Sequence, residues 1–466
     1  MKKYIVSICL SALFFSSCSN WLDVKPKTTV EEEEVFSNEL GFKEALTGIY
    51  IKMTSTDLYA RNLSYGFLDV LGQRYQIKNT TDYQDELWYT FPSTHTESYT
   101  EKIWSEMYNV IANVNNLLYY CDKNRQVFTS EHYYEIIKGE ALGLRAFLHF
   151  DLLRMYGPIY KDNSTAKRIA YRTEFNREAK EMQPSNVVVD SIISDLKKAE
   201  MLLKDTDPLN FEFPKMDYDE EDMKGDAFLV YRHKRMNLYA VKALLARVYL
   251  YAGNKTEAAN YANQVISSDC FELIGDATDI LRSKEIIFSV YVDKFDQQVT
   301  EITDKDDYYI NKESFLNEIF DVAKDGTNDL RIREGVAFDY GSNKITMRKY
   351  KQDNLWASTK GTVVLVRLSE MYYILAECAK TADETASWLN KVRDIRGVDP
   401  VVCTENTRLS EIEKEYRKEF YGEGQLFFFY KCHAYTTFLH CPVNNMTESN
   451  YMFSWPDNEI LFGKTN

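Results

Sequence analysis

The sequence predicts a mainly α-helical protein, in which a frame of paired helices is interrupted by irregular, loop-rich insertions and a few short strands. Long segments after residue 136 place apolar residues every three or four positions, which is the spacing of amphipathic helices. Two other stretches, 61–100 and 268–362, lose this periodicity and contain aromatic residues and short strand-like runs. Because binding residues gather on loops held by a rigid scaffold, these two insertions are the expected ligand-binding regions.

Two single helices are predicted first. The segment 136–156 has one apolar face and ends at Gly157-Pro158, a strong helix stop. Its repeating apolar positions are Ile137, Ala141, Leu144, Leu148, Leu152 and Met155. The segment 186–203 repeats the pattern, with Lys197 and Lys198 on the opposite side.

Helix pairs follow. The segment 237–266 (NLYAVKALLARVYLYAGNKTEAANYANQVI) reads as two helices separated by Gly253-Asn254, a C-cap signal. The positions Leu245, Ala246, Tyr249, Gly253, Ala258 and Ala262 have the spacing of a tetratricopeptide-like unit. A second pair is predicted over 365–396 and a last long helix over 408–423, while Ile286–Val292 and Lys344–Lys349 resemble strands. The sequence therefore predicts a tetratricopeptide-like frame.

The N-terminus predicts export. Lys2 and Lys3 precede an apolar run over residues 4–15, too short to span a membrane, and small residues then lead to Cys18. This arrangement is typical of a lipoprotein signal, although Phe15 stands where an aliphatic residue is usual. We expect a signal peptide over 1–17 and a lipidated tether over 18–35 that begins at Cys18. An ordinary secretory signal with a chance cysteine is the alternative.

Composition and motifs argue against several function classes. The formal net charge of −15 disfavours nucleic acid and anionic lipid as partners. The sequence contains no nucleophile elbow and no HExxH motif, and no carboxylate spacing singles out a glycosidase pair. We therefore expect a protein that is not an enzyme and that holds no cofactor or metal.

One segment carries metal-ligand types, CHAYTTFLHC, in which Cys432-His433 and His440-Cys441 form the two ends. It is compatible with a zinc site, with a local disulfide between Cys432 and Cys441, or with two unrelated buried cysteines.

Several segments, taken in order, resemble the SusD/RagB family. They are GEALGLRAFLHFDLLRMYGPIY (139–160), SNVVVDSIISDLKKAEMLL (185–203), the helix pair 237–266, the later pair 365–396, EKEYRKEFYGEGQ (413–425) and SWPDNEI (454–460). Each motif alone is weak, whereas their order along the whole chain is specific. Tyr416, Leu426 and Phe429 depart from the charged residues usual at those positions, which suggests a divergent branch.

The resemblance implies a single SusD-like domain over 36–466 at the cell surface, lipid-anchored in the outer membrane. Its helical frame would lie against a SusC-like TonB-dependent transporter. Its insertions near 61–100 and 268–362 would hold a glycan or, in some members, a peptide. The alternative from another class is a membrane-tethered tetratricopeptide-like scaffold that binds only protein.

Sugar binding needs aromatic faces for the apolar surface of the rings and polar groups for the hydroxyls. The candidate residues are Asp69, Gln73, Arg74, Tyr75, Trp88, Tyr89 and Phe91 in the first insertion and Tyr291, Phe295, Tyr308 and Tyr309 in the second. We expect Trp88 to be a stacking platform and Arg74 a hydroxyl donor. The alternative is that most of these aromatic residues pack in the core.

Overall fold

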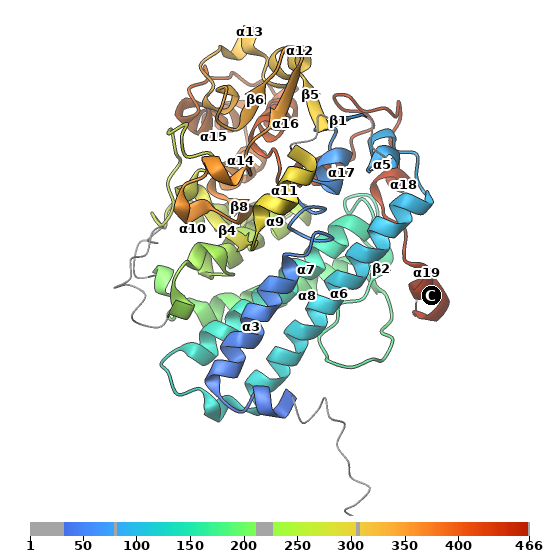
Figure 1. The fold of residues 1–466 in the computed structure, drawn as a ribbon, viewed down its shortest axis with the longest axis vertical. Helices are drawn as coiled ribbons and strands as arrows, with labels where there is room; N and C mark the ends of the chain where they lie inside the picture. The colour runs from blue at the N-terminus through green and yellow to red at the C-terminus, as the bar shows by residue number, and fades with distance from the viewer. Residues whose placement is uncertain (1–31, 79–81, 211–226, 304–307, 465–466) are drawn as a thin grey trace, which may run out of the picture.

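The computed structural model describes residues 32–78, 82–210, 227–303 and 308–464, and helices dominate it (Figure 1). The expectation of a mainly α fold is confirmed. The predicted signal peptide and Cys18 lie outside the described residues. Within the described ranges, no helix combines the length and the apolar character needed to cross a bilayer.

The frame is a chain of packed helices, in which α6 contacts α7, α7 contacts α8, α9 contacts α10 and α14 contacts α15. Its members are α3 (Glu39–Met53), α6 (Thr94–Lys123), α7 (Tyr133–Tyr156), α8 (Ser185–Leu203), α9 (Leu238–Tyr251), α10 (Lys255–Ile266), α14 (Leu368–Cys378), α15 (Ala382–Ile395), α16 (Arg408–Glu419) and α17 (Gln425–His433). The predicted helices at 136–156, 186–203 and 237–266 are confirmed, whereas α3 and α6 were not predicted.

Helix α7 is buried on every side from Gly139 to Tyr156, not on one face as the periodicity suggested. Helices α3, α6, α8 and α9 all pack against it. Its charged residues are paired inside the core, as where Arg145 Nε lies 2.7 Å from Asp195 Oδ2. A polar residue on a predicted solvent face can thus be internal when a partner reaches it.

Three small sheets accompany the helices. Strand β2 (Lys167–Ile169) pairs with β3 (Gln183–Pro184), and β4 (Ile286–Tyr291) pairs with β8 (Thr362–Arg367). The prediction of one helix from residue 365 is wrong for its first three residues, which belong to β8. The run Val363–Val366 is buried and rich in β-branched side chains, which favour a strand.

The third sheet joins the two insertions. Its order is β1 (Gln76–Ile77), β5 (Tyr308–Asn311), β7 (Lys344–Met347) and β6 (Phe338–Tyr340). Strands β1 and β5 are antiparallel, with Gln76 opposite Tyr309 and Ile77 opposite Tyr308. Segments more than 200 residues apart therefore meet at one edge of the molecule.

The remaining short helices are α4 (Phe67–Leu71), α5 (Gln84–Trp88), α11 (Phe295–Thr303), α12 (Lys312–Ser314), α13 (Val322–Asp325), α18 (Glu448–Tyr451) and α19 (Asp457–Phe462).

Helix α16 is fixed to the frame by charges. We name Arg331, Arg367, Arg393, Arg396, Glu415 and Glu419 the α16 ion cluster, and all six are buried. Arg396 Nη2 lies 2.6 Å from Glu419 Oε1, and Arg331 Nη1 lies 3.0 Å from Glu415 Oε2. The helix ends at Glu419, earlier than predicted, because the chain turns through Gly422 and Gly424, whose φ angles are 78° and 65°.

Candidate ligand-binding site

A cavity of about 420 Å³ opens where the two insertions meet, and we name it the insertion pocket. It lies beside β1, β5 and α5, which are neighbours in Figure 1. Its lining residues are Gln73, Arg74, Tyr75, Gln76, Ile77, Leu87, Trp88, Tyr309, Ile310, Asn311, Ser314, Ile319, His440 and Pro442. Both predicted insertions therefore contribute to one concave site of the size usual for small ligands.

Trp88 is the aromatic residue most available to a ligand, because its side chain is 59% exposed while it lines the pocket. It is the last residue of α5, and α5 is tied to the start of α6. Ser93 Oγ donates to Asp85 Oδ2 at 2.6 Å. Ser93 Oγ also accepts from the backbone N–H of Thr96, so that Ser93 is the N-cap of α6. An anchored helix thus presents an open indole ring.

The backbone around Trp88 is held in an unusual conformation. Gln73, Tyr83 and Tyr89 adopt left-handed φ angles of 56°, 56° and 53°. Such angles are costly for large side chains and gather at functional sites. Two buried hydroxyls hold this conformation, because Tyr83 donates to Asn62 Oδ1 at 2.6 Å and Tyr89 donates to the carbonyl of Leu71 at 2.5 Å. Tyr89 is therefore an anchor of the site, and it does not line the pocket.

The opposite wall comes from the second insertion. Tyr309 on β5 is half-buried, with the ammonium of Lys344 4.4 Å from its ring centroid. Amide and hydroxyl groups of Gln73, Gln76, Asn311 and Ser314 also line the pocket. His440 lines it as well, with its Nε2 3.0 Å from Glu318 Oε2. None of the described lining residues is an Asp or Glu. Among the described lining residues, Arg74 is the one whose side chain is always charged.

Arg74, expected from the sequence to donate to ligand hydroxyls, lines the pocket but is held by the frame. It is only 2% exposed, and its guanidinium donates to the backbone carbonyls of Tyr416 and Arg417. It also stacks over Tyr421, at 4.1 Å from the ring centroid. Arg74 thus forms part of the pocket wall, and both of its Nη atoms are bound to the frame.

Asp69 also lies in the core and does not line the pocket. Its carboxylate accepts from the N–H groups of Gly422 at 2.7 Å and Gly424 at 3.0 Å, and from the Tyr75 hydroxyl at 3.2 Å. Burial raises the pKa of Asp69 to about 6, against the opposing effects of Arg74 and these donors. Asp69 therefore joins the first insertion to the turn after α16. Tyr75, whose hydroxyl is bound to Asp69, lines the pocket.

The remaining candidates are dispersed. Tyr291 is 53% exposed at the end of β4, where its ring lies 5.3 Å from Lys234 Nζ, outside the pocket. Phe295 packs in the core against Tyr350 at 5.5 Å between ring centroids. Phe91 packs against Tyr89, and Tyr308 is buried. Sequence reasoning missed Gln76, Asn311 and Ser314, because small polar residues in an irregular segment carry no distinguishing pattern. It singled out His440 as a possible metal ligand and not as a residue of this pocket.

The CHAYTTFLHC segment does not form a ligand cluster. His433 Nε2 lies 3.1 Å from Glu377 Oε2, and His440 Nε2 lies 3.0 Å from Glu318 Oε2. Cys432 and Cys441 are free thiols. The described part of the chain contains no group of three or more His, Cys, Asp or Glu side chains placed to hold a metal ion.

Comparison with known families places the chain. Residues 20–215 match the family described as "Starch-binding associating with outer membrane", and residues 316–431 match the SusD family. Together the two matches cover more than half of the sequence. The chain belongs to the SusD/RagB family. The resemblance inferred from the ordered helical motifs is thereby confirmed.

Individual relatives of this SusD/RagB member are distant. SusD-like protein P25 of Formosa agariphila is 22% identical over 295 residues, which are 60% of this chain and 50% of the relative, so the match spans about half the length of that relative. A SusD-like carbohydrate binding protein from Bacteroides vulgatus has 16% identity and a TM-score of 0.71, over 91% of this chain and 96% of its own. A laminarin binding SusD-like protein has 18% identity and a TM-score of 0.65, over 92% and 99% of the two chains. These structures share the fold.

Proposed function

We propose that this protein binds a neutral glycan in the insertion pocket and delivers it, without cleaving it, to a TonB-dependent outer-membrane transporter. The insertion pocket itself carries the proposal, because it combines an exposed Trp88 and a half-buried Tyr309 with neutral polar groups. Aromatic faces can stack on the apolar face of a sugar ring, while amide, hydroxyl and imidazole groups bond its hydroxyls.

The chemistry of the pocket favours binding over hydrolysis. Glycoside hydrolysis usually uses two carboxyl groups about 5–10 Å apart. The described lining residues include no Asp or Glu, and Asp69 is occupied by the N–H groups of Gly422 and Gly424. This supports a non-catalytic role.

The same chemistry separates the alternatives. A peptide-capturing site would need groups for the charged ends or side chains of a peptide, and the one Arg in the lining, Arg74, is bound to backbone carbonyls. A scaffold that binds only protein has no need of a concave site with a strained backbone at Gln73 and Tyr89. The two solved structures that are named for carbohydrate binding and for laminarin binding support a glycan as the ligand.

The test is a binding screen of the purified chain against starch and laminarin oligosaccharides, with peptides as controls. Trp88→Ala should weaken glycan binding by about 1–3 kcal/mol, because the ring removes a large apolar surface from water. Trp356→Ala is the matched control, since Trp356 is also exposed and lies outside the pocket. Equal affinity in the two variants would remove Trp88 from the site, and selective binding of peptides would favour the alternative.

Membrane attachment through Cys18 is a separate part of the proposal. Acyl chains contribute about 0.8 kcal/mol per buried CH₂, so two or more give stable anchoring. Cys18→Ala should move the protein from the membrane fraction into the soluble fraction. Unchanged membrane retention would contradict lipidation at Cys18.

A further inference from the structure

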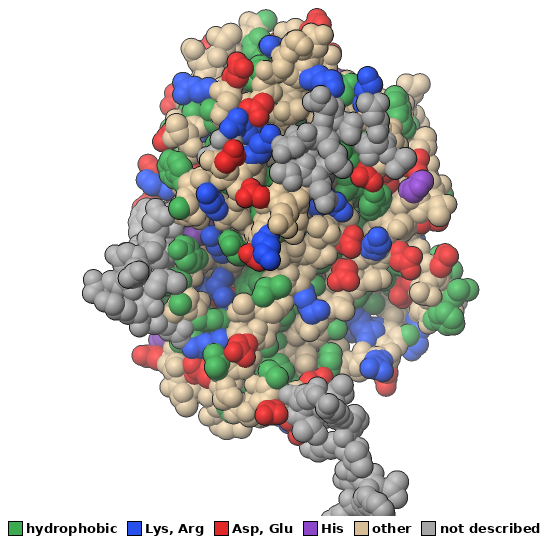
Figure 2. All heavy atoms as spheres, viewed as in Figure 1, with side chains coloured by type: hydrophobic (Ala, Val, Ile, Leu, Met, Phe, Trp, Pro, Cys, Tyr) green, Lys and Arg blue, Asp and Glu red, His purple; other side chains and the backbone are tan. Residues whose placement is uncertain are grey.

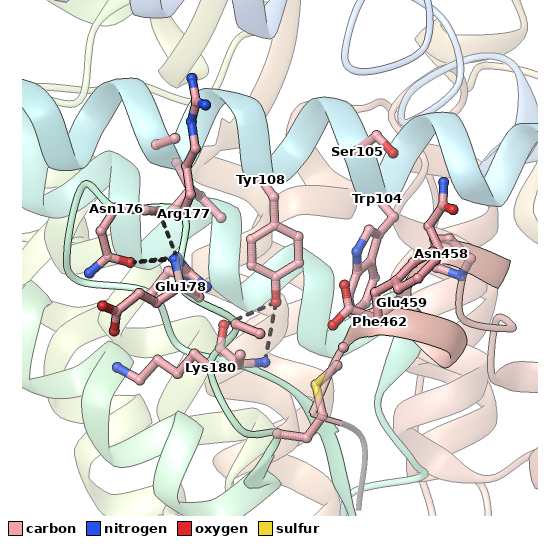
Figure 3. A pocket seen from close by; sticks show the side chains of 18 of the residues that line it. Trp104, Ser105, Tyr108, Asn176, Arg177, Glu178, Lys180, Asn458, Glu459 and Phe462 are labelled. Carbon is pink, nitrogen blue, oxygen red and sulfur yellow. Dashed lines mark hydrogen bonds between the residues drawn. The ribbon is translucent and has the colours of Figure 1, made fainter.

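A second cavity lies between the middle of α6, residues 172–182 and α19 (Figure 3). Its volume is about 440 Å³, close to that of the insertion pocket. We name it the α6 groove.

The α6 groove has an aromatic floor. Trp104 and Tyr108 lie one turn apart on α6 and point into the groove, with ring centroids 4.9 Å apart. The Tyr108 hydroxyl donates to the carbonyl of Ala170 at 3.0 Å and accepts from its N–H at 3.2 Å. The ring of Tyr108, which is half-buried, is thereby fixed in place, and this lowers the entropic cost of stacking a ligand on it. Trp104 is only 5% exposed and forms the buried base of the groove.

Polar groups around the groove come from three separate segments and are available to a ligand. Glu101, Ser105, Arg177 and Asn458 are exposed. Their side chains make no hydrogen bond or salt bridge to any other residue that the structure describes. The set contains donors and acceptors together, as adjacent sugar hydroxyls require.

Helix α19 adds an unusual apolar surface. It has no buried residue, and Phe462, which lines the groove, is 77% exposed. Figure 2 shows hydrophobic side chains gathered at the edge of the molecule where α19 lies. Ile460, Leu461 and Phe462 form a contiguous exposed apolar run, and such a run beside polar groups favours a binding role.

We propose that the α6 groove is a second glycan-binding site, which holds a further stretch of the same polysaccharide chain whose other part occupies the insertion pocket. This inference rests on the proposed function. The two sites are linked through α5 and α6: Trp88 ends α5, α5 is tied to the start of α6, and Trp104 lies ten residues after Thr94, about 15 Å along the helix. Binding at two linked points raises the affinity for a polymer above that of either site.

The test compares polymeric starch or laminarin with disaccharides, which can occupy one site at a time. The double variant Arg177→Ala/Asn458→Ala should lower the affinity for the polymer by roughly tenfold or more, because the second attachment is lost. Binding of the disaccharide in the insertion pocket should persist. Arg333→Ala/Asn263→Ala is the matched control, since both residues are exposed and lie away from the groove.

The outcomes separate the two proposals. If Trp88→Ala weakens polymer binding and the groove variant does not, the second site is refuted and the insertion pocket stands. If the unmodified chain binds neither starch nor laminarin nor any other glycan of the screen, the proposed function fails and the groove proposal fails with it. Both double variants should unfold at the same midpoint temperature as the unmodified protein, which verifies that their folding is intact.

Discussion

The α16 ion cluster and the insertion pocket use polar residues in opposite ways. The cluster buries four arginines and two glutamates, each within salt-bridge distance of another charge. The pocket exposes neutral polar groups beside Trp88, and its one arginine is bound to the frame. In this acidic chain, buried charges therefore fix the fold, while the candidate site is almost free of charge. Stability and ligand binding should consequently be separable by mutation and by solution conditions.

The largest effect is expected from Glu419→Ala. Glu419 accepts from Arg331, Arg367 and Arg396, so its removal takes one carboxylate partner from each of three buried guanidinium groups. Breaking such a pair costs about 3–5 kcal/mol in the free energy of unfolding, measurable by urea titration. Glu272→Ala is the control, because Glu272 pairs with Lys284 at the surface and should leave the midpoint nearly unchanged. Similar midpoints in the two variants would contradict the assigned role of the cluster.

The pH dependence of stability is the next test of the cluster. Burial alone would raise the pKa of Glu415, but Lys418, Arg331 and Arg393 outweigh it and lower the pKa to about 2. The folded state thus binds a proton less readily than the unfolded state. The resulting stabilisation, about 3 kcal/mol, is present above pH ~4.5 and is lost as the pH falls toward ~2. Glu415→Gln should be destabilised at neutral pH. The difference in the free energy of unfolding between this variant and the unmodified protein should narrow as the pH falls from ~4.5 toward ~2. A difference that stays constant with pH would assign the pH dependence to another group.

A smaller effect on stability is expected at the border between the two regions. Arg74→Ala removes two hydrogen bonds to the carbonyls of Tyr416 and Arg417 and should cost about 1–3 kcal/mol of unfolding free energy. Glycan affinity, measured well below the unfolding temperature, should stay within error of the unmodified protein. A loss of affinity without a loss of stability would restore Arg74 as a ligand-binding residue. Arg333→Ala, at an exposed position, is the matched control.

The sequence predicted the frame better than the site. Helical periodicity and alanine spacing identified α7 to α10 because both reflect local backbone geometry. Residue type could not separate Trp88 from Arg74, since both lie in one aperiodic segment and only long-range contacts with the carbonyls of Tyr416 and Arg417 bury the guanidinium of Arg74. The departures at Tyr416 and Phe429 also become interpretable only in three dimensions, where the two rings pack 4.5 Å apart.

The smallest effect is expected from salt, and it sharpens the comparison most directly. Glycan binding in a pocket without free charges should change less than about twofold between about 50 and about 500 mM NaCl, because screening acts on charge pairs and not on stacking or neutral hydrogen bonds. Titration calorimetry at both salt concentrations measures this. Stability of the α16 ion cluster should change little as well, since its charges are buried away from counterions. A steep loss of affinity with salt would instead require a charged ligand, such as a peptide, held by groups outside the described lining of the pocket.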